Sequence, residues 1–240
     1  MGFYQELSRY YDEVFPVNDN EMRFVSTLLK GRVGLLDVGC GTGNKTVRLV
    51  RPGRKIVAVD LDADMIATAA TANRRPDIDY RVADMLKLGE EFPPASFDAA
   101  VCLGNTLVHL TEPGGVETFL RDMAALLSPG GLFIVQILNY DRIIDDNVGT
   151  LPRLEGEHAV FTRSYDWREG RLHFVTELEV RESGEKYDND IILRPLRKHD
   201  LDEILKEAGF TTMEHYGGYA GTPYAKDSFH LIVAALRVVS

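Results

Sequence analysis

The stretch LLDVGCGTGNKT, residues 35–46, decides the fold. Its apolar start ends in Asp37, and glycines follow at positions 39, 41 and 43 before a helix-compatible segment. Because glycine has no Cβ, a ligand can approach such a turn closely, and a helix start behind it offers unpaired N–H groups. A glycine-rich turn between a strand and a helix is weak evidence by itself, since any tight turn favours glycine. The neighbouring segments therefore decide how the turn is interpreted.

Short apolar runs and helix-compatible segments alternate around this turn as far as residue 140. The runs cover residues 33–39, 55–62, 78–85, 97–103 and 132–140. The segments 44–50, 63–74 and 115–127 are helix-compatible, and SPGG at 128–131 is typical of a turn that stops a helix. Apolar runs of this length with helices between them indicate a parallel sheet covered on both faces.

The pattern changes after Tyr140. Residues 158–195 form extended segments whose joins carry hairpin-type glycines. An amphipathic helix is expected over 199–210, with Asp200 near its start and Gly209 as its stop. A loop is expected over 211–221 and a last strand over 228–239. The sequence thus predicts an α/β sheet with an antiparallel β insertion before the last helix and strands.

Composition limits the class of protein. The 240 residues are 45% hydrophobic and 27% charged, as in a globular chain, and the net charge of −10 argues against a nucleic-acid surface. No apolar run approaches the roughly 20 residues that span a bilayer, so no membrane contact is expected. The charged N-terminus does not resemble a signal peptide, and the two cysteines, Cys40 and Cys102, end apolar runs. We therefore expect a cytoplasmic protein without a metal site.

Acidic residues follow three of the predicted strands. Asp60 ends the second strand, where a carboxylate can accept both hydroxyls of a ribose, and Asp84 ends the third, within reach of an adenine amino group. Asp37 precedes the glycines, which suits a ligand with an ammonium or sulfonium group better than a pyrophosphate. In open α/β sheets the ligand lies at the carboxyl ends of the strands, where all these residues fall.

The stretches LLDVGCGTG, VAVDLDADMI, RVADM and FDAAVCLGNTLVHL, in this order and spacing, resemble the motifs of class I S-adenosylmethionine-dependent methyltransferases. The resemblance covers roughly residues 30–140 and implies an enzyme with S-adenosyl-L-methionine as cofactor. It also implies a doubly wound, mostly parallel, seven-stranded Rossmann-like sheet. The alternative, a nicotinamide-binding domain, fits less well because Gly43 comes one residue too early for its pattern and Lys45 fills no position in it.

The resemblance implies roles for individual residues. The glycines would lie against the methionyl part of the cofactor, Asp37 near its charged end, Asp60 at the ribose and Asp84 at the adenine. The full set of implied cofactor residues is Tyr11, Asp37, Gly39, Gly41, Asp60, Leu61, Met65, Asp84, Met85 and Leu103. The implied segments are a helical cap at 1–30, a cofactor-binding core at 31–140, an antiparallel insertion and substrate lid at 141–195, and a completion of the core sheet at 196–240.

Two stretches, CLGNTLVHL at 102–110 and VQILNYDRII at 135–144, are similar to segments of glycine/sarcosine N-methyltransferases, as is the early YYDEVF. This implies that Asn105 touches the substrate and that Tyr10 and Tyr11 help to cover the cofactor. The chain departs from the group at Leu138, where glycine-binding members have an arginine for the substrate carboxylate. An isobutyl group cannot replace a guanidinium, so either Arg194 or Arg163 supplies the charge or the substrate carries no carboxylate there.

Asn105 and His109 are the predicted catalytic residues, and Tyr140 and Arg194 the predicted substrate residues. Asn105 could instead be a plain helix N-cap, and His109, one helical turn later, could be a core histidine bonded to backbone. The glycine-rich loop that carries Tyr219 is an open candidate for a ligand contact. His109 would serve as base if the acceptor atom were oxygen or carbon.

The sequence thus favours a methyltransferase that acts on a small molecule, with an amine nitrogen as acceptor. Three alternatives stay open: an O- or C-methyltransferase of a small metabolite, a non-catalytic S-adenosylmethionine-binding regulator, and a methyltransferase of proteins. A homo-oligomer is compatible with the sequence.

Overall fold

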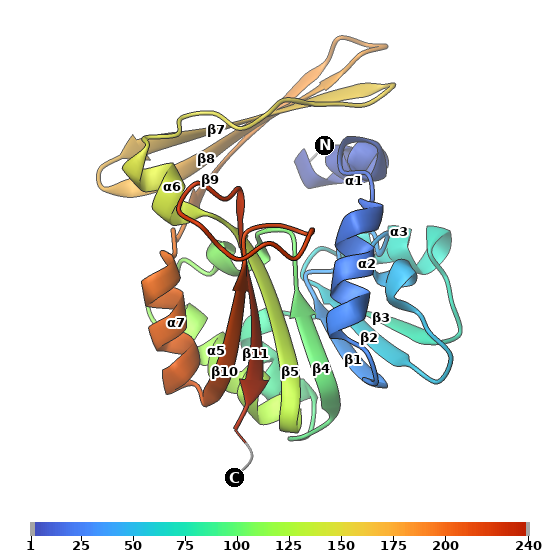
Figure 1. Cartoon of the computed structure of the whole chain (residues 1–240). Helices are drawn as coiled ribbons and strands as arrows, with labels where there is room; N and C mark the ends of the chain where they lie inside the picture. The colour runs from blue at the N-terminus through green and yellow to red at the C-terminus, as the bar shows by residue number, and fades with distance from the viewer. Residues whose placement is uncertain (1–2, 239–240) are drawn as a thin grey trace.

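The computed structural model of the chain describes residues 3–238. The outermost residues of the predicted cap and of the predicted C-terminal segment, 1–2 and 239–240, lie outside the described residues. The described part contains two β-sheets, a seven-stranded sheet A and a four-stranded sheet B. Sheet B lies over the edge of sheet A where the parallel strands end (Figure 1).

Sheet A has the strand order β10-β11-β5-β4-β1-β2-β3. Only β11 runs against its two neighbours, so the predicted mostly parallel, seven-stranded fold is confirmed. The strands are β1 (Gly34–Val38), β2 (Lys55–Asp60), β3 (Ile78–Val82), β4 (Phe97–Cys102), β5 (Leu127–Leu138), β10 (Phe210–Tyr216) and β11 (His230–Arg237).

Helices cover both faces of sheet A because side chains alternate along its strands. Leu36 and its same-face neighbours pack against α4 (Leu88–Glu91), α5 (Gly115–Leu126) and α7 (Lys198–Glu207). Leu35 faces the other way, toward α2 (Asp19–Leu28), α3 (Ala63–Ala72) and the 3₁₀ helix η1 (Thr46–Leu49). Both leucines are fully buried, as expected for a strand covered on both sides.

Sheet B is the predicted antiparallel insertion and precedes α7, β10 and β11. Its strands are β6 (Leu154–Glu155), β7 (Ala159–Arg168), β8 (Arg171–Val180) and β9 (Lys186–Leu193), paired in this order. The short α6 (Tyr140–Asp145) leads into it, and α1 (Phe3–Val14) packs against its inner face through Leu7 and Val14 (Figure 1).

Three local predictions are wrong. Residues 211–216 form β10 rather than a loop, because they pair with β11 despite a register shift between Phe210 and Met213. The SPGG segment lies inside β5, where its bend appears as a register irregularity opposite β4 and as a positive φ of 71° at Gly130. The expected helix over 44–50 is reduced to the single turn η1.

No helix among residues 3–238 combines the length and the apolar character that a membrane crossing requires.

Candidate functional site

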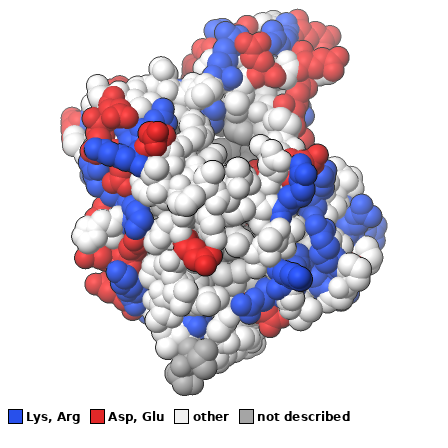
Figure 2. Space-filling view, viewed as in Figure 1, with Lys and Arg blue, Asp and Glu red and all other residues white. Residues whose placement is uncertain are grey.

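A cavity of about 760 Å³ lies between the carboxyl ends of the sheet A strands and the inner face of sheet B. Its volume falls within the roughly 300–1,000 Å³ typical of small-molecule sites. Figure 2 shows this face of the molecule hollowed between the lobe formed by sheet B and the body below. The floor of the cavity is formed by strand ends and the turns after them, the roof by sheet B, and one wall by α1.

The glycine turn forms part of the floor and is closely packed from below. Gly39 and Gly41 have φ angles of 74° and 56°, which residues with a side chain adopt with strain. A Cβ on Gly39 would lie 2.5 Å from Thr106 Cγ2, and one on Gly41 would lie 3.6 Å from the Tyr11 ring. Tyr11 therefore covers the turn from α1.

Asp60 organises the turn from the end of β2. Its Oδ2 accepts a hydrogen bond from Gly41 N at 2.8 Å, and its Oδ1 accepts one from Asp62 N at 3.0 Å. Burial raises the pKa of Asp60, although these backbone donors oppose the shift. Because a carboxylate can accept about four hydrogen bonds, Asp60 can still bind ligand hydroxyls while it holds the turn.

Asp84 stands in the same relation to β3. Its Oδ1 caps the 3₁₀ helix η2 (Met85–Lys87) by accepting from Leu86 N at 3.0 Å, and its side chain lines the cavity. Leu61, Met65 and Met85 line the cavity beside the two acids. Apolar side chains flanked by two carboxylates form a slot suited to an aromatic base and a sugar.

Two predicted cofactor residues, Asp37 and Leu103, lie behind the cavity wall and are absent from its lining. Both are buried because strand residues near the end of β1 and just after β4 alternate between wall and interior. The Asp37 Oδ2 accepts a hydrogen bond from Thr46 Oγ1 at 2.7 Å. Burial raises the pKa of Asp37 to about 6, while Thr46 and the charge of Lys45 oppose the shift. Asp37 can act on a ligand in the cavity through its charge.

Asn105 follows β4 and borders the cavity. It takes the N-cap position of η3 (Thr106–His109) with φ 68° but makes no capping hydrogen bond, so the plain N-cap alternative is wrong. Its Oδ1 accepts from Leu138 N at 2.9 Å, and its Nδ2 donates to the Tyr140 hydroxyl at 3.1 Å. Tyr140, a predicted substrate residue, is fully buried and absent from the lining, so it holds the Asn105 amide instead of contacting a substrate.

His109 lies one turn after Asn105 and its ring is open to the cavity. The surrounding protein desolvates the ring and lowers the pKa of His109. At pH 7 the imidazole is therefore mostly neutral, and one ring nitrogen has a free lone pair.

Arg194, the other predicted substrate residue, turns away from the cavity. Its Nη1 and Nη2 donate to the two carboxylate oxygens of Glu117 at 2.9 and 2.7 Å, and the pairing lowers the pKa of Glu117 to about 2. The prediction that Arg194 contacts the substrate is therefore wrong, because its guanidinium is paired with Glu117 and does not line the cavity. Arg163, the alternative from the same insertion, lines the cavity.

Helix α1 ties the floor to the roof through two consecutive acids. Asp12 accepts hydrogen bonds from Thr42 Oγ1 and, at 2.8 Å, from Asn44 Nδ2, both in the glycine turn. Glu13 accepts from the backbone N–H of His158 and Ala159, at 2.6 and 2.9 Å, at the start of β7. Helix α1 is thus hydrogen-bonded to both the floor and the roof of the cavity.

Sequence reasoning missed a polar group from β5 and β11. The Gln136 Oε1 accepts from Gly104 N at 2.7 Å, and its Nε2 lies 3.1 Å from His230 Nδ1. Burial, with a smaller contribution from Lys45, lowers the pKa of His230 to about 4. The open candidate Tyr219 also lines the cavity, with its ring 5.1 Å from that of His230. No motif identifies these residues, since only the antiparallel pairing of β11 with β5 brings them together.

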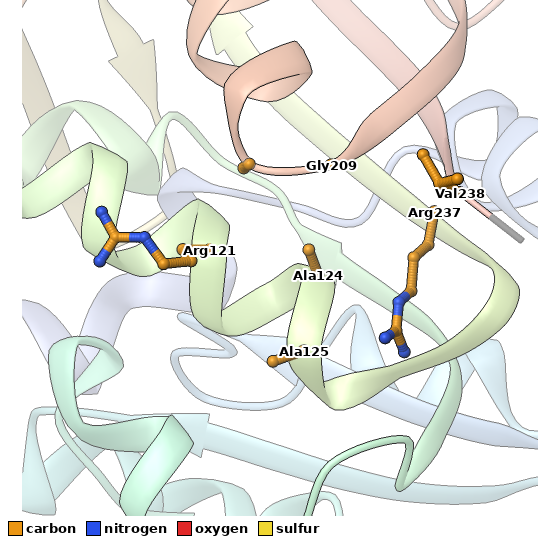
Figure 3. A pocket seen from close by; sticks show the side chains of 7 residues that line it. Arg121, Ala124, Ala125, Gly209, Arg237 and Val238 are labelled. Atoms are coloured by element: carbon orange, nitrogen blue, oxygen red, sulfur yellow. The ribbon is translucent and has the colours of Figure 1, made fainter. Parts of the chain in front are cut away.

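A second, smaller hollow of about 290 Å³ lies at the opposite end of sheet A (Figure 3). Alanines of α5, Gly209 and the stem of Arg237 border it, and the Arg237 guanidinium is already bonded to Leu127 O. It has no acidic or imidazole group in its lining, so it lacks the donor and acceptor set of the large cavity. Within residues 3–238, no cluster of three His, Cys, Asp or Glu side chains could hold a metal ion.

The residues of the floor fit S-adenosylmethionine. Gly39 and Gly41 line the cavity with their backbone, Asp60 can accept ribose hydroxyls, and Asp84 can accept from an adenine amino group. The buried negative charge of Asp37 lies behind the turn, where it favours a cationic ligand.

Comparison with known proteins agrees with this chemistry. Residues 35–131 match the family model described as a methyltransferase domain. A glycine/sarcosine N-methyltransferase of Aphanothece halophytica is 27% identical over 217 residues, which cover 88% of this chain and 79% of that protein.

Two solved structures share the fold. An S-adenosylmethionine-dependent methyltransferase from Clostridium acetobutylicum superimposes with a TM-score of 0.81 and 18% identity over 99% of both chains. CalS10, an amino pentose methyltransferase from Micromonospora echinaspora described with S-adenosylmethionine bound, gives a TM-score of 0.70 and 21% identity over 96% of both chains. With its glycine turn, its strand-end acids and these relatives, the chain carries a methyltransferase domain at residues 35–131 and is similar to class I S-adenosylmethionine-dependent methyltransferases.

Proposed function

We propose that the enzyme methylates an amine nitrogen of a small molecule. The observation that carries the proposal is that Asn105 and a neutral His109 both line a largely apolar cavity beside the cofactor floor. Desolvation disfavours an ammonium ion, so an amine that enters this space loses its proton readily and becomes a nucleophile. The names of the glycine/sarcosine N-methyltransferase and of the amino pentose methyltransferase support the same acceptor atom.

We propose cofactor-binding roles for the residues of the floor. Asp60 would hold the ribose and Asp84 the adenine amino group, with the adenine ring between Met65 and Met85. Tyr11 would close the site from α1. When bound, S-adenosylmethionine supplies the methyl group together with its leaving group.

The protein must then orient the acceptor amine and accept its proton. Asn105 is immobilised by Leu138 N and Tyr140, so its amide can present a fixed dipole to the acceptor amine. His109 can accept the amine proton or hold a water that does so. Sheet B, together with α1, excludes bulk water, and we propose that residues 141–195 act as a substrate lid.

A labelled-methyl assay tests the proposal. The enzyme would be incubated with methyl-labelled S-adenosylmethionine and matched acceptors, each amine paired with its hydroxyl analogue, and the products located by mass spectrometry. We expect label on nitrogen and a reduced turnover for His109→Gln. Label on phenolic or alcoholic oxygen only would overturn the nitrogen assignment and favour O-methylation.

The free thiols support a reducing compartment. Cys40 and Cys102 are both buried, and burial raises the pKa of each well above its usual range, so neither is a reactive thiolate. We propose a cytoplasmic enzyme on this basis.

A further inference from the structure

The turn that carries Asn105 has an unusual backbone conformation. Gly104 and Asn105 follow each other with positive φ angles, of 76° and 68°. Glycine adopts this region freely, but for Asn105 it has a cost, because the Cβ of an L-residue crowds the backbone there. The Asn105 side chain makes no capping bond to η3 that would offset this cost. Contacts from elsewhere in the fold must therefore hold the turn.

Strand β5 supplies two of these contacts through a single residue. It continues past the end of β4, since Cys102, the last residue of β4, pairs with Val135. The next residue, Gln136, accepts from Asn105 N at 3.2 Å with its backbone O and from Gly104 N at 2.7 Å with its Oε1. Gln136 thus binds two successive N–H groups of the turn, one with its backbone and one with its side chain.

The bond from Gly104 N fixes the orientation of the Gln136 amide. A backbone N–H can donate only to the amide oxygen, so the NH₂ group of the amide points the other way. There its Nε2 lies 3.1 Å from His230 Nδ1. His230 lies opposite Leu138 in the pairing of β11 with β5, so it is a diagonal neighbour of Gln136 and within reach of a long side chain.

The amide in turn fixes the tautomer of His230. Because the NH₂ group donates, Nδ1 must accept, and the ring proton must lie on Nε2. Burial and the charge of Lys45 lower the pKa of His230 to about 4, so the ring is neutral at pH 7, as an accepting Nδ1 requires. The ring centroids of Tyr219 and Phe229 lie 5.1 and 4.8 Å from that of His230, so the imidazole is packed between other rings.

This chain of hydrogen bonds has one satisfied arrangement. If the Gln136 amide were flipped, its NH₂ group would face the N–H of Gly104, and two donors would oppose each other. If His230 carried a proton on Nδ1, the same conflict would arise at the other end of the amide. The position of the turn therefore depends on β11, a strand that is distant from it in sequence.

We propose that Gln136 and His230 are positioning residues for methyl transfer, which hold the Gly104–Asn105 turn so that the Asn105 amide faces the acceptor. The step from the turn to the acceptor rests on the proposed function, in which Asn105 orients the acceptor. The chain itself rests on the contacts among Gly104, Gln136 and His230. A misplacement of about 1 Å can lower a rate about 100-fold, so modest hydrogen bonds here have a large effect on turnover.

Histidine NMR tests the chain without turnover. In ¹⁵N-histidine-labelled enzyme saturated with S-adenosylhomocysteine, we expect His230 to carry its proton on Nε2, with His230→Phe identifying its signals. In Gln136→Glu a carboxylate oxygen would face Nδ1, so we expect Nδ1 to carry a proton. A proton on Nδ1 in the wild type, or an unchanged His230 spectrum in Gln136→Glu, would overturn the inference.

Turnover tests the positioning role. Gln136→Met keeps the size of the side chain without its polar atoms, and should lower kcat by about 10- to 100-fold with S-adenosylhomocysteine affinity within about threefold of wild type. Gln136→Glu can still accept from Gly104 N and should recover most of this loss. His230→Phe keeps the ring packing and should lower kcat by about three- to tenfold. The matched control is His215→Phe, which should keep wild-type kcat because His215 pairs with Asp202 and does not line the cavity.

A double-mutant cycle excludes a direct role in ligand binding, since Gln136 and His230 also line the cavity. Asn105→Gly keeps the positive φ and removes the amide. If Gln136 acts through Asn105, Gln136→Met should cost less than about threefold further in the Asn105→Gly background. An equal loss in both backgrounds, or wild-type turnover of either single variant, would overturn the inference.

The choice of acceptor separates this inference from the proposed function. All rates would be measured with whichever acceptor takes the labelled methyl group, amine or hydroxyl. If the label goes to oxygen and the cycle shows coupling between Gln136 and Asn105, the nitrogen assignment fails and the positioning role stands. If an amine is methylated and the cycle shows no coupling, the positioning role fails and the nitrogen assignment stands.

Discussion

The floor and the roof of the central cavity are built in different ways. The floor consists of residues that directly follow parallel strands, such as Gly39, Asp60 and Asp84, and its contacts are short and local. The roof is the face of an antiparallel sheet, where Arg163 meets Thr176 and Asn189 only through the pairing of three strands. Short motifs therefore determine which residues form the floor, whereas strand register determines which residues meet on the roof.

The largest effect is expected from removing Asp60, the carboxylate at the centre of the floor. Asp60→Ala should weaken S-adenosylmethionine binding by about 100-fold or more, because two hydrogen bonds to a charged group are lost at about 1.5–3 kcal/mol each. Calorimetric titration measures the effect. Asp79→Ala is the matched control, since Asp79 lies on the neighbouring strand and pairs with Arg81 on the surface. If Asp60→Ala bound S-adenosylmethionine with unchanged affinity, the floor would not be the cofactor site.

Two glycine variants test how closely the floor packs against Thr106. Gly53→Ala and Gly39→Ala both place a side chain at positive φ, at a cost of about 1–2 kcal/mol in unfolding free energy. Only Gly39→Ala also clashes with Thr106, so it should lose a further ~1–3 kcal/mol and about tenfold in cofactor affinity. Thermal unfolding and calorimetry measure both quantities. Thr106→Ser in the Gly39→Ala background should restore part of the loss, and equal behaviour of the two glycine variants would contradict the packing described.

The charge behind the floor gives a pH dependence. Since the pKa of Asp37 is about 6, its carboxylate is ionised above that pH and favours a cationic ligand. Affinity for S-adenosylmethionine should fall by up to about tenfold per pH unit below pH 6, and this component should vanish in Asp37→Asn.

Stability should respond to Asp37 in the opposite direction. A folded-state pKa raised above the unfolded value of 3.8 means that the group contributes stability below pH 3.8, which is lost as the pH rises through about 6. Asp37→Asn should thus be more stable than the wild type at pH 7 while binding the cofactor less well. A destabilised variant with unchanged affinity would contradict this role for Asp37.

The smallest effect concerns the boundary between floor and roof. Tyr140→Phe removes the hydroxyl that holds the Asn105 amide, so turnover should fall by about three- to tenfold with cofactor affinity unchanged. Tyr224→Phe is the control, because the Tyr224 hydroxyl bonds Asn139 and Asp141 outside the cavity. A loss of cofactor affinity in Tyr140→Phe would mean that Asn105 acts in cofactor binding and not on the acceptor.

The order of motifs predicts the floor well because its cavity-lining residues lie at the carboxyl ends of the parallel strands or in the turns and helix starts that follow them. Asp60, Asp84, Met65 and Met85 all line the cavity, as do Asn105 and His109. The sequence does not show, however, which of the neighbouring residues are buried behind the cavity wall. These are Asp37, Leu103 and Tyr140, which are close in sequence to lining residues.

The roof could not be predicted to the same degree. The sequence favours Arg194 over Arg163 as a substrate residue, but Arg194 is paired with Glu117, which is distant in the chain, and Arg163 is the one that lines the cavity. Strand β10 was missed for a related reason, since its polar edge residues form a strand only through pairing with β11. Both failures concern contacts between segments far apart in sequence, which local patterns do not encode.

A crystal structure with S-adenosylhomocysteine tests the account most directly. We predict the adenosine between Asp60 and Asp84, with the sulfur directed toward Asn105 and His109. Adenosine bound away from these two acids would contradict the assignment of the floor to the cofactor.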